Sequence, residues 1–503
     1  MSKRRIIAFD AGGTAVKAAL YDERGAELGV AGATMAPLHP APGCLERDPA
    51  AMWTAICGVS RKVLEKAGVA PSSIVAVGLT GYGNALYLLD HSGRPVRNGI
   101  LSPDLRAEAI VAQWRASGLE DEVIPLTYQR LWPGKPAPLL AWLEAHEPEA
   151  LERADHAMFC KDYLRFRLTG AVGLEVSDLS SGGLADQGAR RFAPEILDHF
   201  GLGRYARLYG EGLEPLTVFG AVTKEAAAAT GLVAGTPVST GYADGPAMAL
   251  GLGAIDESLI SVIAGTWGLN QLASRVPVKD GSINALMLGP RPGEYILTDA
   301  APTSASTFEW FVDSVVAAAD PAPRDHAALF EFCDALAARA HGGDDAPYFL
   351  PYLNGRLDQP EARGGFVGLA SWHGLPEMIR AIFEGVAFEH RWHIDRLLKG
   401  RTRPRAARFA GGAARSQPWL DIFAAAIDLP LELAAASELG ALGAAIVAAV
   451  GVGLHPDLET AVAAMSHVRG RIEPDRALIE TLARRRAVYG ELVEALKPTW
   501  AKL

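Results

Sequence analysis

The sequence is poor in cysteine and lacks the short motifs that mark several common protein classes. Its 503 residues include four cysteines, none in CxxC spacing, so neither a disulfide framework nor a cysteine-ligated zinc site is indicated. No GxxxxGKS/T occurs, which removes the P-loop route to nucleotide binding. No GxSxG occurs either, so a serine hydrolase has no support.

Excess basic charge and a membrane-length apolar helix are also missing. Lys and Arg number 48 against 58 Asp and Glu, a net charge of −10, so no nucleic-acid partner is expected. The basic start MSKRRIIAFD has only four apolar residues before Asp10, too few for a secretory signal. The Ala- and Gly-rich run 439–454 has 16 residues, fewer than the ~20 of a spanning helix. We therefore expect a cytoplasmic protein without a membrane partner.

The chain is long enough for about three domains, or two large ones, and its pattern favours two related halves. Apolar segments 6–9 and 16–21 flank a glycine-rich bend and predict a β-hairpin. Segments 259–263 and 267–272 repeat this pattern, and Thr14 and Thr266 lie 252 positions apart. A chance match is the alternative to duplication. We place the domains at residues 1–250 and 251–503.

Strand-like and helix-like segments are mixed along both halves. Strand patterns at 74–79, 86–89 and 407–410 alternate with helical patterns, which we place at residues 50–67, 107–117, 139–146, 307–319 and 376–398. This mixture predicts an α/β fold. No low-complexity linker separates the halves, so we expect them to pack closely with a cleft between them.

The stretch Asp10-Ala11-Gly12-Gly13-Thr14 is the most informative candidate site. Glycines let a backbone approach a ligand closely, so this bend can direct N–H groups and a hydroxyl at phosphate oxygens. A carboxylate beside a phosphate needs a cation between them, which suggests Mg²⁺ at Asp10. A glycine turn capped by aspartate is the alternative.

Two later glycine-rich turns are candidates as well. Asp244 follows the strand-like residues 237–240, where its carboxylate could accept a proton from a hydroxyl, or could form an ordinary Asx turn. Gly411-Gly412 follows a strand end, where it could hold a base or ribose, or simply connect a strand to a helix. We interpret His390 and His393 as packed or surface residues, because a third metal ligand is missing.

Taken together and in order, these segments resemble the FGGY carbohydrate kinases, the sugar and polyol kinases of the actin-like ATPase superfamily. The most specific segments are residues 364–369 and, seven residues later, 377–385, which fit the C-terminal signature of that family. The resemblance covers essentially the whole chain. It implies two ribonuclease-H-like domains flanking a central cleft for ATP and sugar.

The resemblance also implies roles for individual residues. Asp244 corresponds to the catalytic base, and Asp10 and Asp244 approach Mg²⁺ and the transferred phosphoryl group. Trp267 stands in a place often held by Ser or Cys. The residues expected to bind ATP are Gly12, Gly13, Thr14, Lys17, Gly265 and Thr266 at the phosphates and Gly411, Gly412, Ala413 and Gln417 at the adenosine.

The sugar pocket departs from two known specificities of the family. The expected substrate residues are Tyr82, Asn84, Ser102, Asp104, Trp132 and Asp244. Ser102 replaces a common Trp, and Gly83-Asn84 replaces both the Arg-Glu of glycerol kinases and the Met-His of D-xylulose kinases. Neither of those substrates can be assumed.

Residues 99–104, 126–132 and 142–149 look most like bacterial L-xylulose kinases. We expect transfer of the γ-phosphoryl group of Mg-ATP to a primary hydroxyl of a ketopentose such as L-xylulose or D-xylulose. An erythritol or polyol kinase, and a non-catalytic sugar or nucleotide sensor, are the alternatives. A polymerising actin-like ATPase is disfavoured by the sugar-side motifs. Family membership points to a homodimer.

Overall fold

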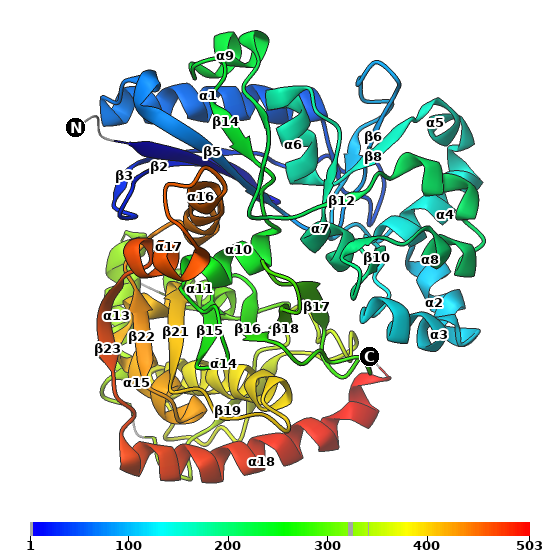
Figure 1. Cartoon of the computed structure of the whole chain (residues 1–503). Helices are drawn as coiled ribbons and strands as arrows, with labels where there is room; N and C mark the ends of the chain where they lie inside the picture. Colours follow the sequence, from blue (N-terminus) through cyan, green and yellow to red (C-terminus); the bar gives the residue numbers. More distant parts are fainter. Residues whose placement is uncertain (1–3, 320–324, 341, 503) are drawn as a thin grey trace. The chain divides into compact units, whose positions relative to one another are not determined.

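The structure is a computed structural model that describes residues 4–319, 325–340 and 342–502. The chain divides into two compact units (Figure 1). Unit 1 comprises Met1–Ile255, Ala273–Leu297 and Ala436–His467, and unit 2 comprises Asp256–Leu272, Thr298–Ala435 and Val468–Leu503. The division into domains 1–250 and 251–503 stays a prediction.

Unit 1 contains a six-stranded mixed sheet with the order β13-β14-β5-β1-β2-β3. Strands β1 (Arg5–Ala11) and β2 (Ala15–Asp22) pair antiparallel, which confirms the predicted first hairpin. β1 also pairs parallel with β5 (Ile74–Gly81), and β5 pairs parallel with β14 (Pro237–Ser239). The edges are β3 (Glu27–Thr34) and β13 (Val218–Ala221).

Helices cover both faces of this sheet. Because side chains alternate along a strand, Ile7 packs into the cluster that includes α1 (Pro49–Ala67), whereas Ile6 packs into the cluster that includes α16 (Leu439–Gly451). The two helices lie on opposite sides of β1, β2 and β5 (Figure 1). α16 is the small-residue helix that the sequence predicts, and its alanines and glycines let it lie close to the sheet.

A second, seven-stranded sheet has the order β17-β18-β16-β15-β21-β22-β23. β15 (Leu259–Ala264) pairs antiparallel with β16 (Gly268–Ser274) and parallel with β21 (Ala406–Gly411), which pairs parallel with β22 (Leu431–Ala434). The hairpin and the two following parallel strands repeat the arrangement of β2-β1-β5-β14. The remaining strands of this sheet are β17 (Ala285–Leu288), β18 (Tyr295–Ala301) and β23 (Val468–Ile472).

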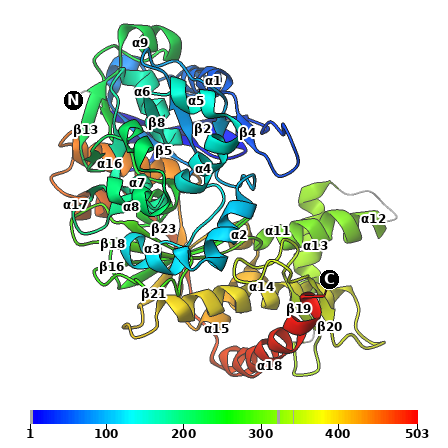
Figure 2. The same ribbon diagram turned by 90° about the vertical axis from the view of Figure 1, so that its right-hand side faces the viewer.

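Helices α14 (Leu375–Leu397), α15 (Gln417–Ile427) and α18 (Arg476–Trp500) pack together in unit 2 (Figure 2). The rings of Phe383 and Trp419 stack with centroids 4.3 Å apart between α14 and α15. The expected helix 307–319 is divided by a π-helical turn, Val312–Val316, into α11 (Ala305–Phe311) and α12 (Ala317–Ala319). A π turn holds one extra residue, so it interrupts the helical periodicity.

The other elements are shorter. In unit 1 they are β4 (Glu46–Arg47), η1 (Pro71–Ser73), β6 (Tyr87–Leu89), β7 (Gly99–Ile100), α2 (Glu108–Ala116), α3 (Leu119–Thr127), α4 (Pro136–His146), α5 (Pro148–Arg153), β8 (His156–Met158), α6 (Cys160–Thr169), β9 (Leu174–Glu175), α7 (Val176–Ser181), β10 (Ala185–Asp186), β11 (Arg191–Phe192), α8 (Pro194–His199), η2 (Gly203–Leu208), β12 (Gly212–Leu213), α9 (Lys224–Thr230), α10 (Asp244–Gly251) and α17 (Leu458–Met465). In unit 2 they are α13 (His326–Ala337), β19 (Tyr348–Leu350), β20 (Gly365–Val367) and η4 (Gly412–Arg415).

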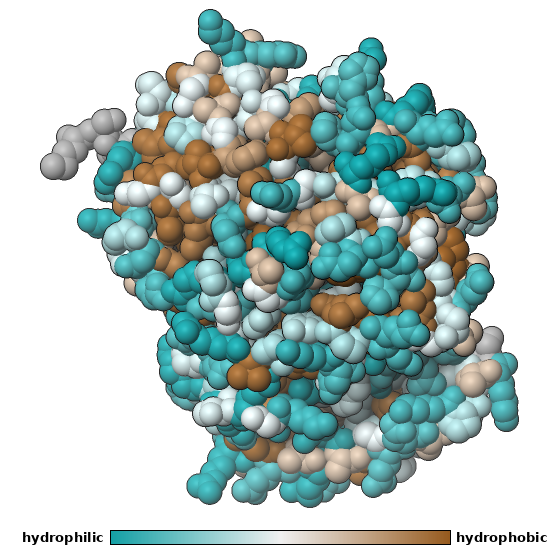
Figure 3. Space-filling model, turned by 45° about the vertical axis from the view of Figure 1, so that its right-hand side comes forward, coloured by the Kyte–Doolittle hydropathy of each residue, from teal (hydrophilic) through white to brown (hydrophobic). Residues whose placement is uncertain are grey.

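On the face drawn in Figure 3, hydrophobic residues form several separate patches among hydrophilic ones. Within the described part of the chain, we find no helix that combines the length and the apolar character needed to cross a membrane.

Candidate active site

The bend between β1 and β2 is fixed by hydrogen bonds at its base. The backbone N–H of Gly12 donates to the carbonyl of Ala15 at 2.9 Å. The buried guanidinium of Arg47 donates to the carbonyls of Gly13 and Met35. Thr14 is exposed at the tip, so the predicted phosphate-binding bend is held rigidly with its tip open to solvent.

Asp10 lies at the end of β1, beside the start of α16. A Cβ atom on Gly440 would lie 2.5 Å from Asp10 Oδ2, so the helix can come this close because residue 440 has no side chain. Burial raises the pKa of Asp10 to about 7; the charges of Asp244 and Glu438 also raise it and that of Lys17 lowers it. Removing a carboxylate from water disfavours its charged form, so this site has a local excess of negative charge.

Lys17 projects from β2 and forms an ion pair within unit 1. Its Nζ donates to Glu438 Oε2 at 2.8 Å and to Glu438 Oε1 at 3.1 Å. Its ammonium group therefore compensates the Glu438 carboxylate. A contact between Lys17 and phosphate stays a prediction.

Asp244 is the first residue of α10 and follows the loop that leaves β14. The backbone N–H of Gly245 donates to Asp244 Oδ1 at 2.7 Å. Burial raises the pKa of Asp244 to about 6, while hydrogen bonds from backbone N–H groups, including that of Gly83, lower it. Such a carboxylate is largely ionised at neutral pH and is still basic enough to accept a proton.

The carboxylates of Asp10 and Asp244 are suitable ligands for Mg²⁺. Mg²⁺ in kinases is usually bound by one or two carboxylates together with substrate phosphates, rather than by a full protein cage. Consistent with this, no cluster of three or more His, Cys, Asp or Glu residues suited to a metal occurs among the described residues. The charge of Asp244 also raises the pKa of Asp10, and a bound cation would relieve this repulsion.

Three of the predicted substrate residues lie together. Asn84 Nδ2 lies 3.5 Å from Ser102 Oγ, and Trp132 Nε1 donates to the Ser102 carbonyl at 2.8 Å. Ser181, at the end of α7, lies 3.4 Å from Asn84 Oδ1 and was missed from the sequence. Its only sequence signal is a pair of serines in an ordinary helical segment, which does not point to a pocket.

The backbone beside this group is strained. Asn84 and Ala85 have φ angles of 56° and 68°, in the left-handed region that residues other than glycine rarely adopt. Each such residue costs about 1–3 kcal/mol and persists mainly where the surrounding structure requires it, often at a functional site. Asn tolerates this conformation better than most residues, so Gly83-Asn84 is a signal that the sequence could have given.

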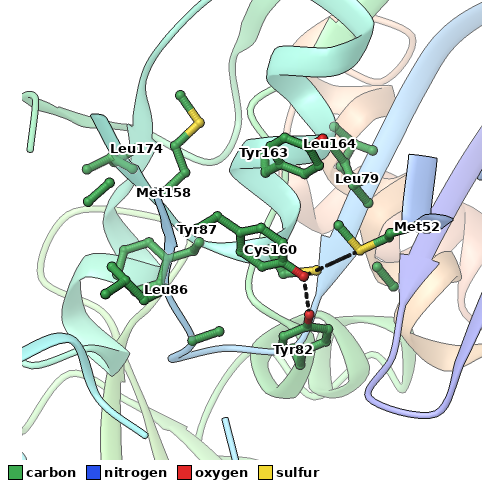
Figure 4. Packing of buried hydrophobic residues seen from close by; sticks show 14 of the residues in the cluster. Met52, Leu79, Tyr82, Leu86, Tyr87, Met158, Cys160, Tyr163, Leu164 and Leu174 are labelled. Atoms are coloured by element: carbon green, nitrogen blue, oxygen red, sulfur yellow. Dashed lines mark hydrogen bonds between the residues drawn. The ribbon is translucent and has the colours of Figure 1, made fainter. Parts of the chain in front are cut away.

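Two other predicted substrate residues have partners within the protein. The hydroxyl of Tyr82 forms a hydrogen bond with that of Tyr87 in a buried cluster that also holds Cys160 and Met52 (Figure 4). Asp104 is fully buried, and its Oδ2 accepts the N–H of Leu45 at 2.6 Å. Arg106 Nε donates to Asp104 Oδ1 at 2.9 Å. Contact of Tyr82 and Asp104 with a sugar stays a prediction.

The hairpin of unit 2 resembles that of unit 1 in its hydrogen bonds. The N–H of Gly265 donates to the carbonyl of Trp267 at 3.2 Å, and Thr266 is exposed at the tip. Ser306 Oγ and the N–H of Ser304 donate to the Thr266 carbonyl, the former at 2.8 Å. A second open tip, matching Thr14, is thus held from below.

The predicted adenosine residues lie at the end of β21 and the start of α15. Gly411 has a φ of 103°, and a Cβ atom there would lie 2.2 Å from the Ala264 carbonyl oxygen, so no other residue fits without a shift. Gly412 is exposed, whereas Ala413 is buried. Gln417 is exposed, and its Nε2 donates to Asp421 Oδ1 at 2.8 Å.

The histidines of α14 are packed, as the sequence predicts. His390 Nε2 lies 2.8 Å from Ser304 Oγ, and His390 Nδ1 lies 2.8 Å from Asn270 Oδ1. His393 Nδ1 lies 2.9 Å from Asp299 Oδ2. Both side chains are buried and take part in polar networks of unit 2.

Comparison with known proteins identifies the family. Residues 5–251 match the N-terminal domain of the FGGY family of carbohydrate kinases, and residues 260–452 match its C-terminal domain. The chain belongs to this FGGY family. It is therefore a carbohydrate kinase, which uses ATP to phosphorylate a sugar.

Relatives of this FGGY kinase match over almost their full length. It is 34% identical to L-xylulose/3-keto-L-gulonate kinase of Escherichia coli strain K12, covering 99% of this chain and 98% of the relative. It is 30% identical to the probable L-xylulose kinase of Pasteurella multocida strain Pm70, over 98% and 99%. It is 29% identical to erythritol kinase of Brucella abortus strain 2308, over 99% and 97%.

A solved structure confirms the fold. The crystal structure of xylulose kinase from Rhodospirillum rubrum superposes on this FGGY kinase with a TM-score of 0.89 at 29% identity, covering 99% of this chain and all of that one. The α/β fold with two ribonuclease-H-like domains, as in actin-like ATPases, is thus confirmed. The repeated strand order of the two sheets has the same origin.

Proposed function

We propose that this FGGY kinase phosphorylates a primary hydroxyl of a ketopentose of the xylulose type, giving a sugar phosphate and ADP. The observation that carries this proposal is the full-length similarity, at 34% and 30% identity, to two proteins named as L-xylulose kinases. The group formed by Asn84, Ser102 and Trp132 supports it, since these residues supply hydroxyl and amide groups suited to the hydroxyls of a small sugar.

Asp244 is proposed as the general base. Its carboxylate accepts the proton of the sugar hydroxyl as that oxygen attacks the γ-phosphoryl group. Hydrogen bonds from the N–H groups of Gly245 and Gly83 keep the carboxylate oriented. Asp10 and Asp244 would hold Mg²⁺, which neutralises charge on the phosphates when bound.

ATP is proposed to bind through the residues that the family resemblance indicates. The exposed tips around Thr14 and Thr266 present backbone N–H groups and hydroxyls suited to phosphate oxygens. The proposed phosphate contacts are Gly12, Gly13, Thr14, Lys17, Gly265 and Thr266, and the proposed adenosine contacts are Gly411, Gly412, Ala413 and Gln417.

ADP release from Mg-ATP tests the substrate. The purified protein is assayed with L- and D-xylulose, L- and D-ribulose, erythritol, xylitol and glycerol, with a blank without sugar. We expect strong stimulation by one xylulose enantiomer. Erythritol is the second candidate, because the chain is 29% identical to an erythritol kinase. Stimulation by erythritol alone would replace the ketopentose, and stimulation by no sugar would favour a sensor.

Asp244→Asn tests the base. A general base typically contributes about 10²–10⁴-fold, so kcat should fall by that factor while the fold is retained. Asp186→Asn is the matched control, because Asp186 forms an Asx-type turn with the N–H groups of Gly188 and Ala189, remote in sequence from the proposed machinery. Near-normal turnover in Asp244→Asn would remove the assignment.

We also infer that the kinase acts in the cytoplasm, where ATP is supplied, and that it forms a homodimer, as its family membership indicates. Sedimentation of the 53.2 kDa chain tests the second point. A species of twice this mass is expected, and a monomer at assay concentration would contradict it.

A further inference from the structure

A cluster of buried charges lies beneath the loop that leads to Asp244. Lys161 Nζ, from α6, lies 2.7 Å from Asp178 Oδ2, 3.1 Å from Glu175 Oε2 and 3.3 Å from Asp162 Oδ1. Arg165 Nη1 joins the cluster at 2.7 Å from Asp162 Oδ1. None of these five side chains, here called the Lys161 cluster, is exposed to solvent. Burying several charges costs free energy, and none of them has a part in the phosphoryl transfer proposed above.

The Lys161 cluster holds both ends of the connection between β14 and α10. At its start, Arg165 Nη1 donates to the Thr240 carbonyl at 2.7 Å. At its end, the N–H of Ala243 donates to Ser177 Oγ at 3.0 Å, and Ser177 Oγ donates in turn to Glu175 Oε2. Ala243 directly precedes Asp244, so one hydroxyl group links the cluster to the backbone that carries the proposed base.

The middle of the connection packs against the cluster as well. Gly241 has a φ of 90°, and a Cβ atom there would lie 3.2 Å from Lys161 Cδ and 2.8 Å from the Leu79 carbonyl oxygen. A Cβ atom on Gly83 would lie 3.6 Å from Asp178 Oδ1. The cluster therefore contacts both loops that supply hydrogen bonds to Asp244, since Gly83 N–H is one of its donors.

We propose that Ser177, held by Glu175 and Lys161, is a positioning residue that fixes the Asp244 carboxylate relative to the attacking hydroxyl. Glu175 orients the Ser177 hydroxyl, which binds the Ala243 N–H and so sets the start of α10. This inference rests on the proposed role of Asp244 as base. The physical reason is distance, because a general base must lie within hydrogen-bond reach and a 1 Å misplacement can cost about 10²-fold in rate.

Ser177→Ala is the variant that tests the proposal, with Ser180→Ala as its matched control. Ser180 lies on the same helix and is equally buried, but its hydroxyl donates to Gln187 Oε1 at 2.9 Å and accepts the Leu288 N–H at 3.1 Å. We expect Ser177→Ala to lower kcat at least about tenfold and to leave KM for ATP within about twofold. Ser180→Ala should keep kcat within about twofold. An unchanged kcat in folded Ser177→Ala overturns the proposal.

Combining Ser177→Ala with Asp244→Asn separates positioning from a merely structural effect. If Ser177 acts through Asp244, its loss should change the residual rate of Asp244→Asn by less than about twofold. The same loss factor in both backgrounds contradicts the positioning role. If Asp244→Asn alone leaves kcat unchanged, the base assignment itself fails, which is a distinct outcome.

Amide hydrogen exchange gives a readout that does not depend on turnover. In Ser177→Ala, the peptide that contains Ala243 should exchange faster than in the wild type, because its N–H loses a buried acceptor. In Ser180→Ala, exchange of that peptide should match the wild type. Equal exchange of that peptide in all three proteins would overturn the proposal.

Discussion

His390 shows how burial sets the protonation state of a single residue. A neutral imidazole satisfies both of its neighbours, since Nδ1–H donates to Asn270 Oδ1 and Nε2 accepts from Ser304 Oγ, each at 2.8 Å. Burial lowers the pKa of His390 to about 3, and His393 contributes in the same direction. The neutral side chain thus supports Ser304, which holds the carbonyl of Thr266.

This pKa predicts a pH dependence of stability. In the unfolded chain the histidine titrates near its ordinary pKa of about 6.5, so between about pH 3 and 6.5 the unfolded state binds more protons. The free energy of unfolding from this group is therefore complete above pH 6.5 and is lost as the pH falls. At pH 5 the loss should be about 2 kcal/mol. Urea unfolding at pH 7 and 5 should show a smaller difference for His390→Asn than for the wild type.

The control is His146→Asn. His146 is exposed near the end of α4 and bonds only locally, to the Trp142 carbonyl among described contacts. This variant should keep the wild-type pH dependence. Identical slopes for the wild type and both variants would show that His390 does not titrate as expected.

At this scale the sequence predicted what is local. Asp10 and Asp244 were found because each stands beside glycines in a bend or turn, and that signal lies within a few residues. Arg47 and Ser181 were missed because their partners Gly13 and Asn84 lie 34 and 97 residues away. No local pattern marks an arginine or a serine for such a distant contact.

At the scale of elements, α10 and α16 are in backbone contact. A Cβ atom on Gly443 would lie 1.9 Å from the Ala247 carbonyl oxygen, and one on Gly251 would lie 2.2 Å from that of Leu439. The sequence left open whether the small residues of α16 admit a ligand or a helix. At Gly443 and Gly251 the structure shows a helix.

Gly443→Ala should therefore destabilise unit 1. Overpacking a close contact costs about 1–3 kcal/mol or more, which exceeds the gain in helix propensity from Gly to Ala. Gly490→Ala in α18 is the matched control, because a Cβ atom there meets nothing within 4 Å. That variant should gain about 0.5–1 kcal/mol. Urea unfolding of both variants measures the contrast, and a Gly443→Ala protein as stable as the wild type would contradict the close contact.

For the whole molecule, the repeated hairpins in the sequence predicted two sheets of one topology, and the strand orders confirm it. The sequence did not show that Ala436–His467 return to unit 1 after the strands of unit 2. Apolar periodicity reveals which face of α16 is buried but not which sheet buries it. That choice depends on contacts between segments some 400 residues apart, such as Lys17 with Glu438.

Truncation tests this return of the chain. α16 and α17 cover Ile6, Ala8 and Tyr21, all fully buried, so a chain of residues 1–435 would leave one face of the unit 1 sheet open to water. A chain of residues 1–467 loses β23 and α18 in the same way but keeps α16 and α17. Peptides from β1 and β5 should therefore resist amide hydrogen exchange in 1–467 and exchange quickly in 1–435. Equal protection in the two truncated chains would mean that this sheet does not depend on α16, and the burial of β1 and β5 would then have to come from α1 alone.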